Sequence, residues 1–468
     1  LQVVWTNSHG LFVIGPFMAG CYLAAALFRR FRGAEDGETV PAARLFALVT
    51  LATFVTPFGP EGWRYAFLLA REAGPAASEF FKSLAELAPT FSPRTMALPD
   101  FWAYGLVLLL ACLTTVPLLA RGKAHAGRVL IVVFLGVAAV SGRRNISLFV
   151  LAATPLIAEN TGLLLPLLRL PAAAKAGATL LLLALTWFPL SGSYYRWLNY
   201  PLRFGLGASP TFFPSSLAEF VRRAGVRGQL YNGNYLGGFC LYHGIRPLVD
   251  GRWEVYDEST LKMVFAAPFD EVEWRRLIAT YDVGGVLLLH DSPEARGLLP
   301  RLHGDPLWRL VYYDKAASFW MRTDRGSLPP AADVAALPAG AASPRRIEEY
   351  LALATFYRLT AVPQSSLRCL DATLALGEKR ETVLEQLGRA QSDLGRSAEA
   401  EETFRTLLAE HKTNISALNE LAFLAYGRGD LARAEAYLRR ALAIRPQDAD
   451  IRANYERIVG ARGGGPSP

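Results

Sequence analysis

Apolar residues in the first two hundred positions gather into long runs rather than into short alternating segments. Three runs, 10–28, 101–120 and 176–195, contain no Lys, Arg, Asp or Glu. Each is long enough to cross a bilayer as a helix, because a span needs about 20 apolar residues. A fourth run, 45–60, is slightly short. These runs predict helices inside a membrane.

Two further apolar runs, 129–142 and 146–158, are separated only by Arg143, Arg144 and Asn145. Such a short separation predicts a helical hairpin that does not fully cross the bilayer. A buried hairpin of a soluble domain would show the same pattern, but the four neighbouring runs favour the membrane. We therefore expect residues 1–196 to form an α-helical transmembrane bundle of about six spans.

Lys and Arg are unevenly distributed over the connections between these runs. The connections after the first, third and fifth expected helices are dense in basic residues, whereas the 61–100 stretch contains four basic and five acidic residues. Because basic connections tend to stay in the cytoplasm, the last span should end on the outer side. Everything after about residue 196 is then expected to be extracytoplasmic.

The pattern changes at residues 205–325, where amphipathic helices alternate with short apolar segments. This alternation predicts a small α/β domain with a largely parallel sheet. The expected helices are 215–226 and 271–283, and the expected strands are 228–233, 245–251, 284–290 and a hairpin within 307–322.

Polar residues follow the first two of these expected strands. Asn234 and Tyr235 follow the first strand, while Asp250, Arg252 and Tyr256 follow the second. Since ligands bind beside the carboxyl ends of strands in open α/β sheets, we expect these five side chains to form one substrate-binding site. Asn-Gly and Asp-Gly are also common turn dipeptides. For Asp250 and Arg252 the sequence leaves a binding role and a structural ion pair equally open.

Residues 347–446 repeat with a period of 34, within an expected repeat domain that covers 346–461. One copy has Gly388, Gly395, Ala400 and Phe404, matched 34 positions later by Ala422, Gly429, Ala434 and Leu438. An earlier and more divergent copy precedes them, and 447–461 is expected to form a capping helix. This pattern resembles the tetratricopeptide (TPR) repeat, so we expect an all-α solenoid whose groove binds a protein partner. A Pro/Ala-rich linker, 326–345, precedes the repeats.

Composition agrees with a membrane half and a soluble half. Only 19% of the 468 residues are charged, against about 25% in ordinary soluble proteins. The net charge of +8 comes without any nucleic-acid motif, so we expect no nucleic-acid partner. The four cysteines are far apart and show no spacing suited to a metal site. The usual sequence signatures of soluble hydrolases, nucleotide-binding proteins and metalloproteases are also missing.

The N-terminal half resembles the polytopic C-type glycosyltransferases, which take a sugar from a polyprenyl-phosphate donor. The resemblance is carried by "WTNSHGLFVIG", by "TPFGPEGW" followed by "ASEFFKSLAELAPTF", and by "GRRNISLFVLAATPLI". The segment "YNGNYLGGFCLYHGIRPLVDGRWEVY" is similar to one that follows the membrane region in many bacterial members with TPR tails. The resemblance implies a bacterial inner-membrane protein with a lipid-linked sugar donor.

The resemblance also implies roles for individual residues. Glu79, Glu86 and His9 become the catalytic candidates, and Arg143, Arg144 and Asn145 become candidates for binding the donor phosphate. Arg or a divalent metal ion would stabilise the departing phosphate. In this family the catalytic carboxylate usually lies in the first outer loop. Because this sequence begins in a later part of such a bundle, we expect that carboxylate in a preceding segment.

Each of these residues has a plainer interpretation. Arg143 and Arg144 would also extend toward lipid headgroups, and His9 would also be satisfied by backbone groups at the membrane interface. At the level of the whole chain, the alternative to an enzyme is a membrane-anchored TPR scaffold for protein assembly. A transporter is disfavoured, because the spans show no inverted repeat.

Overall fold

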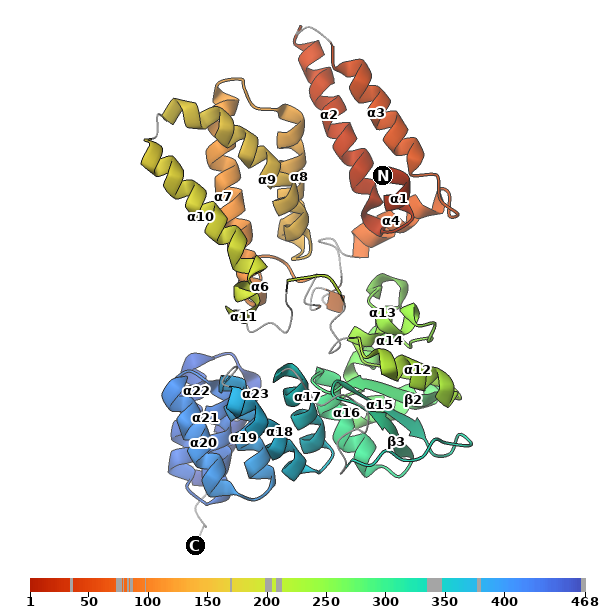
Figure 1. Cartoon of the computed structure of the whole chain (residues 1–468), viewed down its shortest axis with the longest axis vertical. Coiled ribbons are helices and arrows are strands. Elements are labelled where there is room, and N and C mark those ends of the chain that lie inside the picture. The colour runs from red at the N-terminus through yellow and green to blue at the C-terminus, as the bar shows by residue number, and fades with distance from the viewer. Residues whose placement is uncertain are drawn as a thin grey trace. The chain divides into compact units, whose positions relative to one another are not determined.

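The computed structural model describes residues 1–33, 37–72, 78, 80–81, 84, 87–96, 98–168, 171–197, 204–207, 213–334, 347–376 and 380–463. The chain divides into two compact units, Leu1–Ala184 and Leu185–Pro468. Helices predominate in both units, and four strands occur among the described residues of the second (Figure 1).

The first unit consists of helices. They are α1 (Gln2–Thr6), η1 (Gly10–Val13), α2 (Ile14–Phe31), α3 (Thr39–Ala52), α4 (Glu61–Glu72), α6 (Pro93–Met96), α7 (Pro99–Ala120), α8 (Ala126–Ser141), α9 (Asn145–Leu164), η2 (Leu165–Leu168) and α10 (Ala172–Leu190), which continues into the second unit. Four helical segments are long and apolar enough to cross a membrane: Gly10–Phe31, Pro99–Ala120, Asn145–Leu164 and Ala172–Leu190. These four helices are the ones that fit a membrane protein.

Of the about six expected spans, four lie in helices that meet this criterion among the described residues. The helices α3 and α8 are apolar but shorter than the other four. Helix α3 ends at Ala52, eight residues before the expected end of its run. Thr53 turns back to donate to the Thr50 carbonyl at 2.5 Å and accepts from Trp63 Nε1 at 2.9 Å. Gly59 then takes a positive φ of 50°, so the chain turns where a longer span was predicted.

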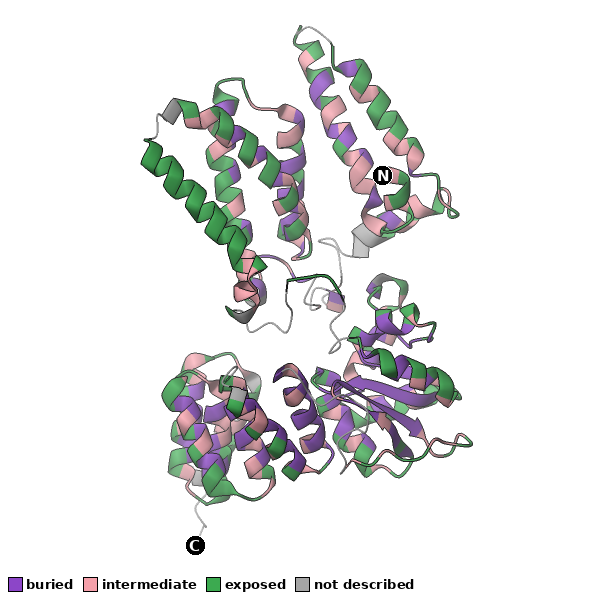
Figure 2. Cartoon of the chain, in the orientation of Figure 1, coloured by how far each residue is buried: buried purple, intermediate pink, exposed green. Residues whose placement is uncertain are grey.

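The expected hairpin is present, although its second arm is longer than predicted. Helix α9 continues to Leu164 and is long enough to span. It packs against α8 through Phe149, which is fully buried against Gly136. Tyr104 of α7 donates to the Gly136 carbonyl at 3.1 Å. Outward-facing residues such as Leu113 are 60% exposed, and α10 contains no buried residue (Figure 2). Apolar surface of this kind suits contact with lipid.

The second unit begins with a short helix and a small α/β module. Its elements are α11 (Ser193–Trp197), α12 (Ser215–Ala224), β1 (Gln229–Asn232), η3 (Asn234–Leu236), α13 (Gly237–Tyr242), η4 (Trp253–Val255), α14 (Glu258–Ala266), α15 (Glu271–Tyr281), β2 (Val283–Leu289), α16 (Pro293–Gly304), β3 (Trp308–Tyr313) and β4 (Ala317–Arg322). The strands form one sheet in the order β1-β2-β4-β3, and its strands are largely buried (Figure 2).

The prediction of a largely parallel sheet is wrong. Only β1 and β2 pair in parallel, whereas β4 is antiparallel to both β2 and β3. The hairpin explains the difference, because two strands joined by a tight turn must run antiparallel. Asp314 forms that turn by accepting from Ala316 N and Ala317 N at 2.8 and 2.9 Å. The expected strand 245–251 is reduced to one bridge, between Leu230 and Pro247.

Three helical hairpins and a final helix complete the second unit. They are α17 (Ile347–Leu359) with α18 (Pro363–Leu376), α19 (Arg380–Asp393) with α20 (Ser397–Glu410), α21 (Ile415–Gly427) with α22 (Leu431–Ile444), and α23 (Ala449–Gly463). Gly395 and Gly429 stand one repeat apart at the turns, with φ of 73° and 78°. The equivalent position in the first hairpin is Ala361, whose φ is 58°.

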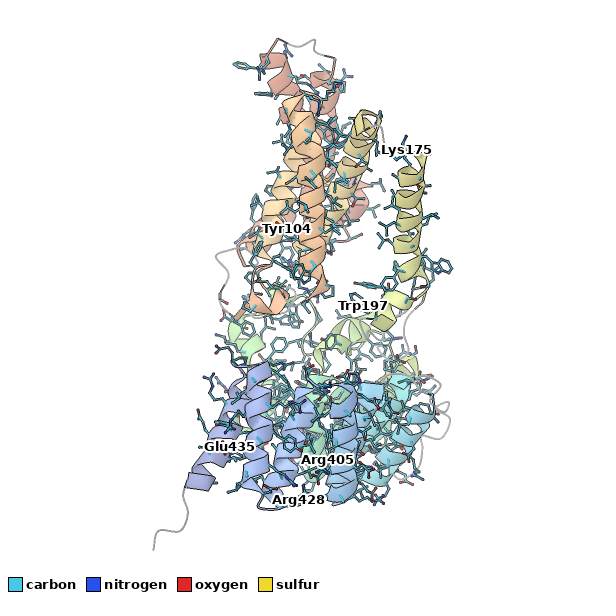
Figure 3. All side chains as sticks on the ribbon, turned by 90° about the vertical axis from the view of Figure 1, so that its left-hand side faces the viewer. Tyr104, Lys175, Trp197, Arg405, Arg428 and Glu435 are labelled. Atoms are coloured by element: carbon cyan, nitrogen blue, oxygen red, sulfur yellow. The ribbon has the colours of Figure 1, made fainter. Side chains whose placement is uncertain are left out.

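Charged side chains on the second helices of the repeats are tied into pairs. Glu401 pairs with both Arg405 and Arg428, and Glu435 pairs with Arg439 one repeat later. Figure 3 labels Arg405, Arg428 and Glu435 on the repeat helices. The two Arg side chains hold the pKa of Glu401 below its usual range, Arg428 having the larger effect. The Glu401–Arg428 pair links α20 to the end of α21, whereas the other two pairs lie within one helix. The core of these repeats contains Phe404, Leu421 and Leu438.

The α/β module and the first hairpin pack against each other within this unit. His290, which follows β2, stacks on Phe356 of α17 with ring centroids 4.3 Å apart, and Tyr313 of β3 stacks on Phe356 at 5.0 Å. Lys315 pairs with the buried Glu349 at 2.7 Å. Part of the expected linker also contacts the sheet, because Ala332 N donates to the Leu310 carbonyl at 2.9 Å. Residues 335–346 lie outside the described residues.

Candidate functional site

A polar groove lies along the first helices of the repeats. Its cavity has a volume of about 680 Å³, within the range of about 300–1,000 Å³ that is usual for ligand sites. The repeat residues that line it come from α19, α21 and α23 and from the turns before the last two helices. Glu385, Asn419 and Asn454 occupy the middle of the three helices, about one repeat apart. Successive repeats thus present a row of polar side chains.

Arg389 organises one end of the groove. Its guanidinium contacts Glu420 at 2.9 Å, Glu385 at 3.0 Å and Ser416 Oγ at 2.6 Å. Ser416 in turn donates to Glu385 at 2.9 Å. Glu381 accepts from the Asn414 amide at 2.9 Å, and the same Asn414 caps α21 by accepting from Ala417 N. These side chains are committed to one another and give the wall a fixed shape.

Other groups in the groove keep hydrogen-bonding capacity. Asn454 donates to Asn419 Oδ1 at 3.3 Å, which leaves the Asn419 amide N–H groups and Asn454 Oδ1 without a described partner. Adjacent amides that donate and accept suit the N–H and C=O groups of an extended peptide. Ile415 and Ile451 add apolar surface beside them. The arrangement can therefore hold a polar peptide without any covalent chemistry.

A second polar cluster lies in the loop that follows the Leu230–Pro247 bridge. Asp250 is 2% exposed, and its carboxylate accepts from Arg252 N and Nε at 2.9 Å, from a terminal Arg252 nitrogen at 2.7 Å and from the Tyr256 hydroxyl at 3.0 Å. Chiefly through the Arg252 hydrogen bond, these contacts hold the pKa of Asp250 below its usual range. Burial, reinforced by Asp250, raises the pKa of Tyr256. Because both carboxylate oxygens are occupied, the geometry supports the structural ion pair.

Asn232 and Gly237 bring this loop close to β1. Asn232 is buried, donates to the Val249 carbonyl and accepts from Leu248 N, both at 2.8 Å. A Cβ at Gly237 would lie 2.4 Å from the Asp250 Cα, so only glycine fits there. The loop around Asp250 is therefore joined to the end of β1 through Asn232, which precedes a glycine as many turn residues do.

The other two residues predicted for this site have different surroundings. The backbone N–H of Asn234 donates to Glu294 of α16 at 3.3 Å, and the Tyr235 side chain is 64% exposed. The structure thus brings Asp250, Arg252 and Tyr256 together by direct hydrogen bonds, while the Asn234 backbone contacts the first turn of α16.

In the first unit, the turn between α8 and α9 places the three predicted phosphate-binding residues differently. Arg143 Nε contacts Asp100 of α7 at 2.5 Å, and its backbone N–H donates to the Ala88 carbonyl at 2.9 Å. The Asn145 amide donates to the Ala138 carbonyl at 3.0 Å, closing the turn. Arg144 is exposed and has no hydrogen-bond or ion-pair partner in the part of the chain that the structure describes. Of the two arginines, only Arg144 has a guanidinium group without an ion-pair partner among these residues.

The catalytic candidates are only partly placed. His9 is exposed, and its Nδ1 accepts from Leu11 N at 3.0 Å at the start of η1, so it caps a helical turn. Glu79 and Glu86 lie outside the described residues. Within those residues, no group of three or more His, Cys, Asp or Glu side chains is placed to hold a metal ion.

Sequence reasoning did not identify Arg296 as a site residue. It belongs to α16 of the α/β module, yet it lines the same groove as Asn419 and Asn454. No local signal marks it, because an exposed Arg on an amphipathic helix is ordinary. Only the packing of α17 against the sheet brings α16 to the groove.

Comparison with known proteins identifies one part of the chain. Residues 391–458, from α19 to α23, match the family model for the tetratricopeptide repeat. No curated protein matches the chain. The repeats are thus similar to a module that generally binds partner proteins, and the chain combines this module with helices that fit a membrane protein.

Proposed function

We propose that this protein is a membrane-anchored adaptor whose repeat groove binds an extended, polar peptide segment of a partner protein. The observation that carries this proposal is the groove itself, in which the amides of Asn419 and Asn454 keep hydrogen-bonding capacity beside a rigid Arg389 network. The four long apolar helices support the anchor.

A peptide-display selection on the full chain in lipid nanodiscs tests this function. We expect enriched peptides to lose about three- to tenfold in affinity for Asn419→Ala and for Asn454→Ala, since each lost hydrogen bond is worth about 0.5–1.5 kcal/mol. Glu402→Ala is the matched control, because Glu402 is exposed on α20 and does not line the groove. Equal binding by all three variants would contradict the proposal.

We also propose that the groove is extracytoplasmic. The support is the asymmetric distribution of Lys and Arg over the helix connections. A tag at the carboxyl end should then be digested by protease added to spheroplasts. Protection of the tag until the membrane is permeabilised would place the groove in the cytoplasm.

The second candidate function is transfer of a sugar from a polyprenyl-phosphate donor at the outer face of a bacterial inner membrane. Arg144 favours it, because an exposed guanidinium without a described partner can bind a phosphate in bidentate fashion. Asp100 holds the neighbouring Arg143, and Glu79 and Glu86 remain the proposed catalytic carboxylates.

Binding of undecaprenyl phosphate to the full chain separates this function from the adaptor. Arg144→Ala should weaken binding about tenfold or more, given about 1.5–3 kcal/mol for a hydrogen bond to a charged group. Arg121→Ala is the control, because Arg121 is also exposed but already donates to the Pro117 carbonyl. Undiminished lipid binding by Arg144→Ala would remove the support for this second function.

A further inference from the structure

The groove is not built by the repeats alone. Arg296, which lines it, belongs to α16, and this helix is fixed on the α/β module by the buried Leu298, Leu299 and Leu302. Arg301 reinforces the attachment by pairing with Glu271 at 2.7 Å and donating to the Ala267 carbonyl at 3.1 Å. Arg296 is therefore presented to the groove from a rigid helix outside the repeat array.

The arginines that line the groove differ in how far they are paired with acidic side chains. Arg389 is occupied by Glu385, Glu420 and Ser416, whereas Arg445 approaches Asp448 only at 3.9 Å. Arg296 has no hydrogen-bond or ion-pair partner among residues 213–334, 347–376 and 380–463. The groove thus offers a cation at the side formed by α16.

We propose that Arg296 binds a carboxylate of the peptide segment held in the groove, so that the α/β module selects the partner together with the repeats. This inference rests on the proposed peptide-binding function. A guanidinium forms paired hydrogen bonds with a carboxylate. Glu381, Glu385, Asp448 and Asp450 also line the groove, so a singly charged carboxylate suits it better than a doubly charged phosphate.

The carboxylate has two sources, an acidic side chain or the carboxyl terminus of the peptide. Display selection on the full chain in nanodiscs, followed by synthesis of one enriched peptide, distinguishes them. The peptide is made with Glu or Gln at each acidic position, and with a free or amidated carboxyl end. A side-chain source is shown when the Gln form binds about tenfold more weakly, and a terminal source when the amidated form does.

Charge reversal tests the role of Arg296. The variant Arg296→Glu should bind the acidic peptides about tenfold or more weakly than the unchanged chain. In the selection it should instead enrich peptides with Lys or Arg at the same position. The matched control is Arg309→Glu, which reverses an exposed charge of the same module on β3, outside the groove. This control should select the same peptides as the unchanged chain.

Two results would overturn the inference, and they differ from each other. If Arg296→Glu selects the same acidic peptides as the unchanged chain, Arg296 does not bind the carboxylate, while peptide binding by the repeats stands. If the unchanged chain enriches no peptide, the peptide-binding function fails, and the inference fails with it.

Discussion

At the residue scale, two buried polar side chains of the second unit are treated in opposite ways. Asp250 has hydrogen bonds to both carboxylate oxygens, from Arg252 and Tyr256. His290 is fully buried, and neither ring nitrogen has a hydrogen-bond partner within the described part of the chain. Burial lowers the pKa of His290 to about 3, an effect that the nearby Ala317 backbone only partly offsets. The first side chain should stabilise the fold, and the second should weaken it in acid.

The pH dependence of stability should reveal His290. Its pKa is lower in the folded state, so the unfolded chain binds more protons between about pH 6.5 and pH 3. The free energy of unfolding should therefore fall as the pH falls through this window, by up to about 1.4 kcal/mol per pH unit. Urea unfolding of residues 213–468 should show a shallower fall for His290→Phe. Parallel pH profiles for the two proteins would contradict this assignment.

The substitution Asp250→Asn tests the ion pair in the loop. It should lower the free energy of unfolding by about 1–2 kcal/mol, less than a fully buried pair would lose, because the Arg252 side chain is 61% exposed. Glu219→Gln removes an exposed pair with Arg223 and should cost less than about 0.5 kcal/mol. Equal effects of the two substitutions in urea titrations would argue against a structural role for Asp250.

At the element scale, the sequence identified elements with strong periodicity and missed those set by distant contacts. The 34-residue period predicts the helical hairpins because the small residues recur at the helix crossings. In the first unit, by contrast, the apolar run does not reveal that α3 ends at Ala52, because the end depends on the contact of Thr53 with Trp63. The sequence also did not reveal that β4 pairs with β2, and this pairing makes the sheet mixed. Arg296 entered the candidate site through tertiary packing alone.

The turns of the repeats offer a reciprocal prediction. Ala361 has a φ of 58° where Gly395 and Gly429 occupy the equivalent turns. A left-handed backbone costs an L-residue about 1–2 kcal/mol. Replacing alanine by glycine removes this cost, but it also raises the entropy of the unfolded chain, which offsets part of the gain. Ala361→Gly should therefore raise the free energy of unfolding by about 0.5 kcal/mol, and Gly395→Ala should lower it by about 1 kcal/mol. Chemical denaturation of both variants checks the signs, and a destabilising Ala361→Gly would refute the prediction.

At the scale of the whole molecule, the second unit is expected to unfold as one body. Phe356 is fully buried between His290 and Tyr313, and Glu349 is buried beside Lys315. The α/β module and the first hairpin therefore share an apolar interface with a buried ion pair. Cooperative unfolding across such an interface is the ordinary behaviour of one packed domain.

Calorimetry on residues 213–468 tests this cooperativity. The unchanged fragment should show a single transition, whereas Phe356→Ala should lose about 3–5 kcal/mol of stability and separate the transition into two. Phe404→Ala is the control, since it removes an equally buried ring from the repeat core, away from the module interface. A single transition in Phe356→Ala would show that the ring does not couple the two modules.

The stack of His290, Phe356 and Tyr313 also has a mechanical consequence. These rings fix the first hairpin on the sheet. The orientation of the groove relative to the sheet is therefore set by this packed contact and not by the length of the chain between the modules. A peptide bound in the repeats would therefore keep a fixed orientation relative to the α/β module.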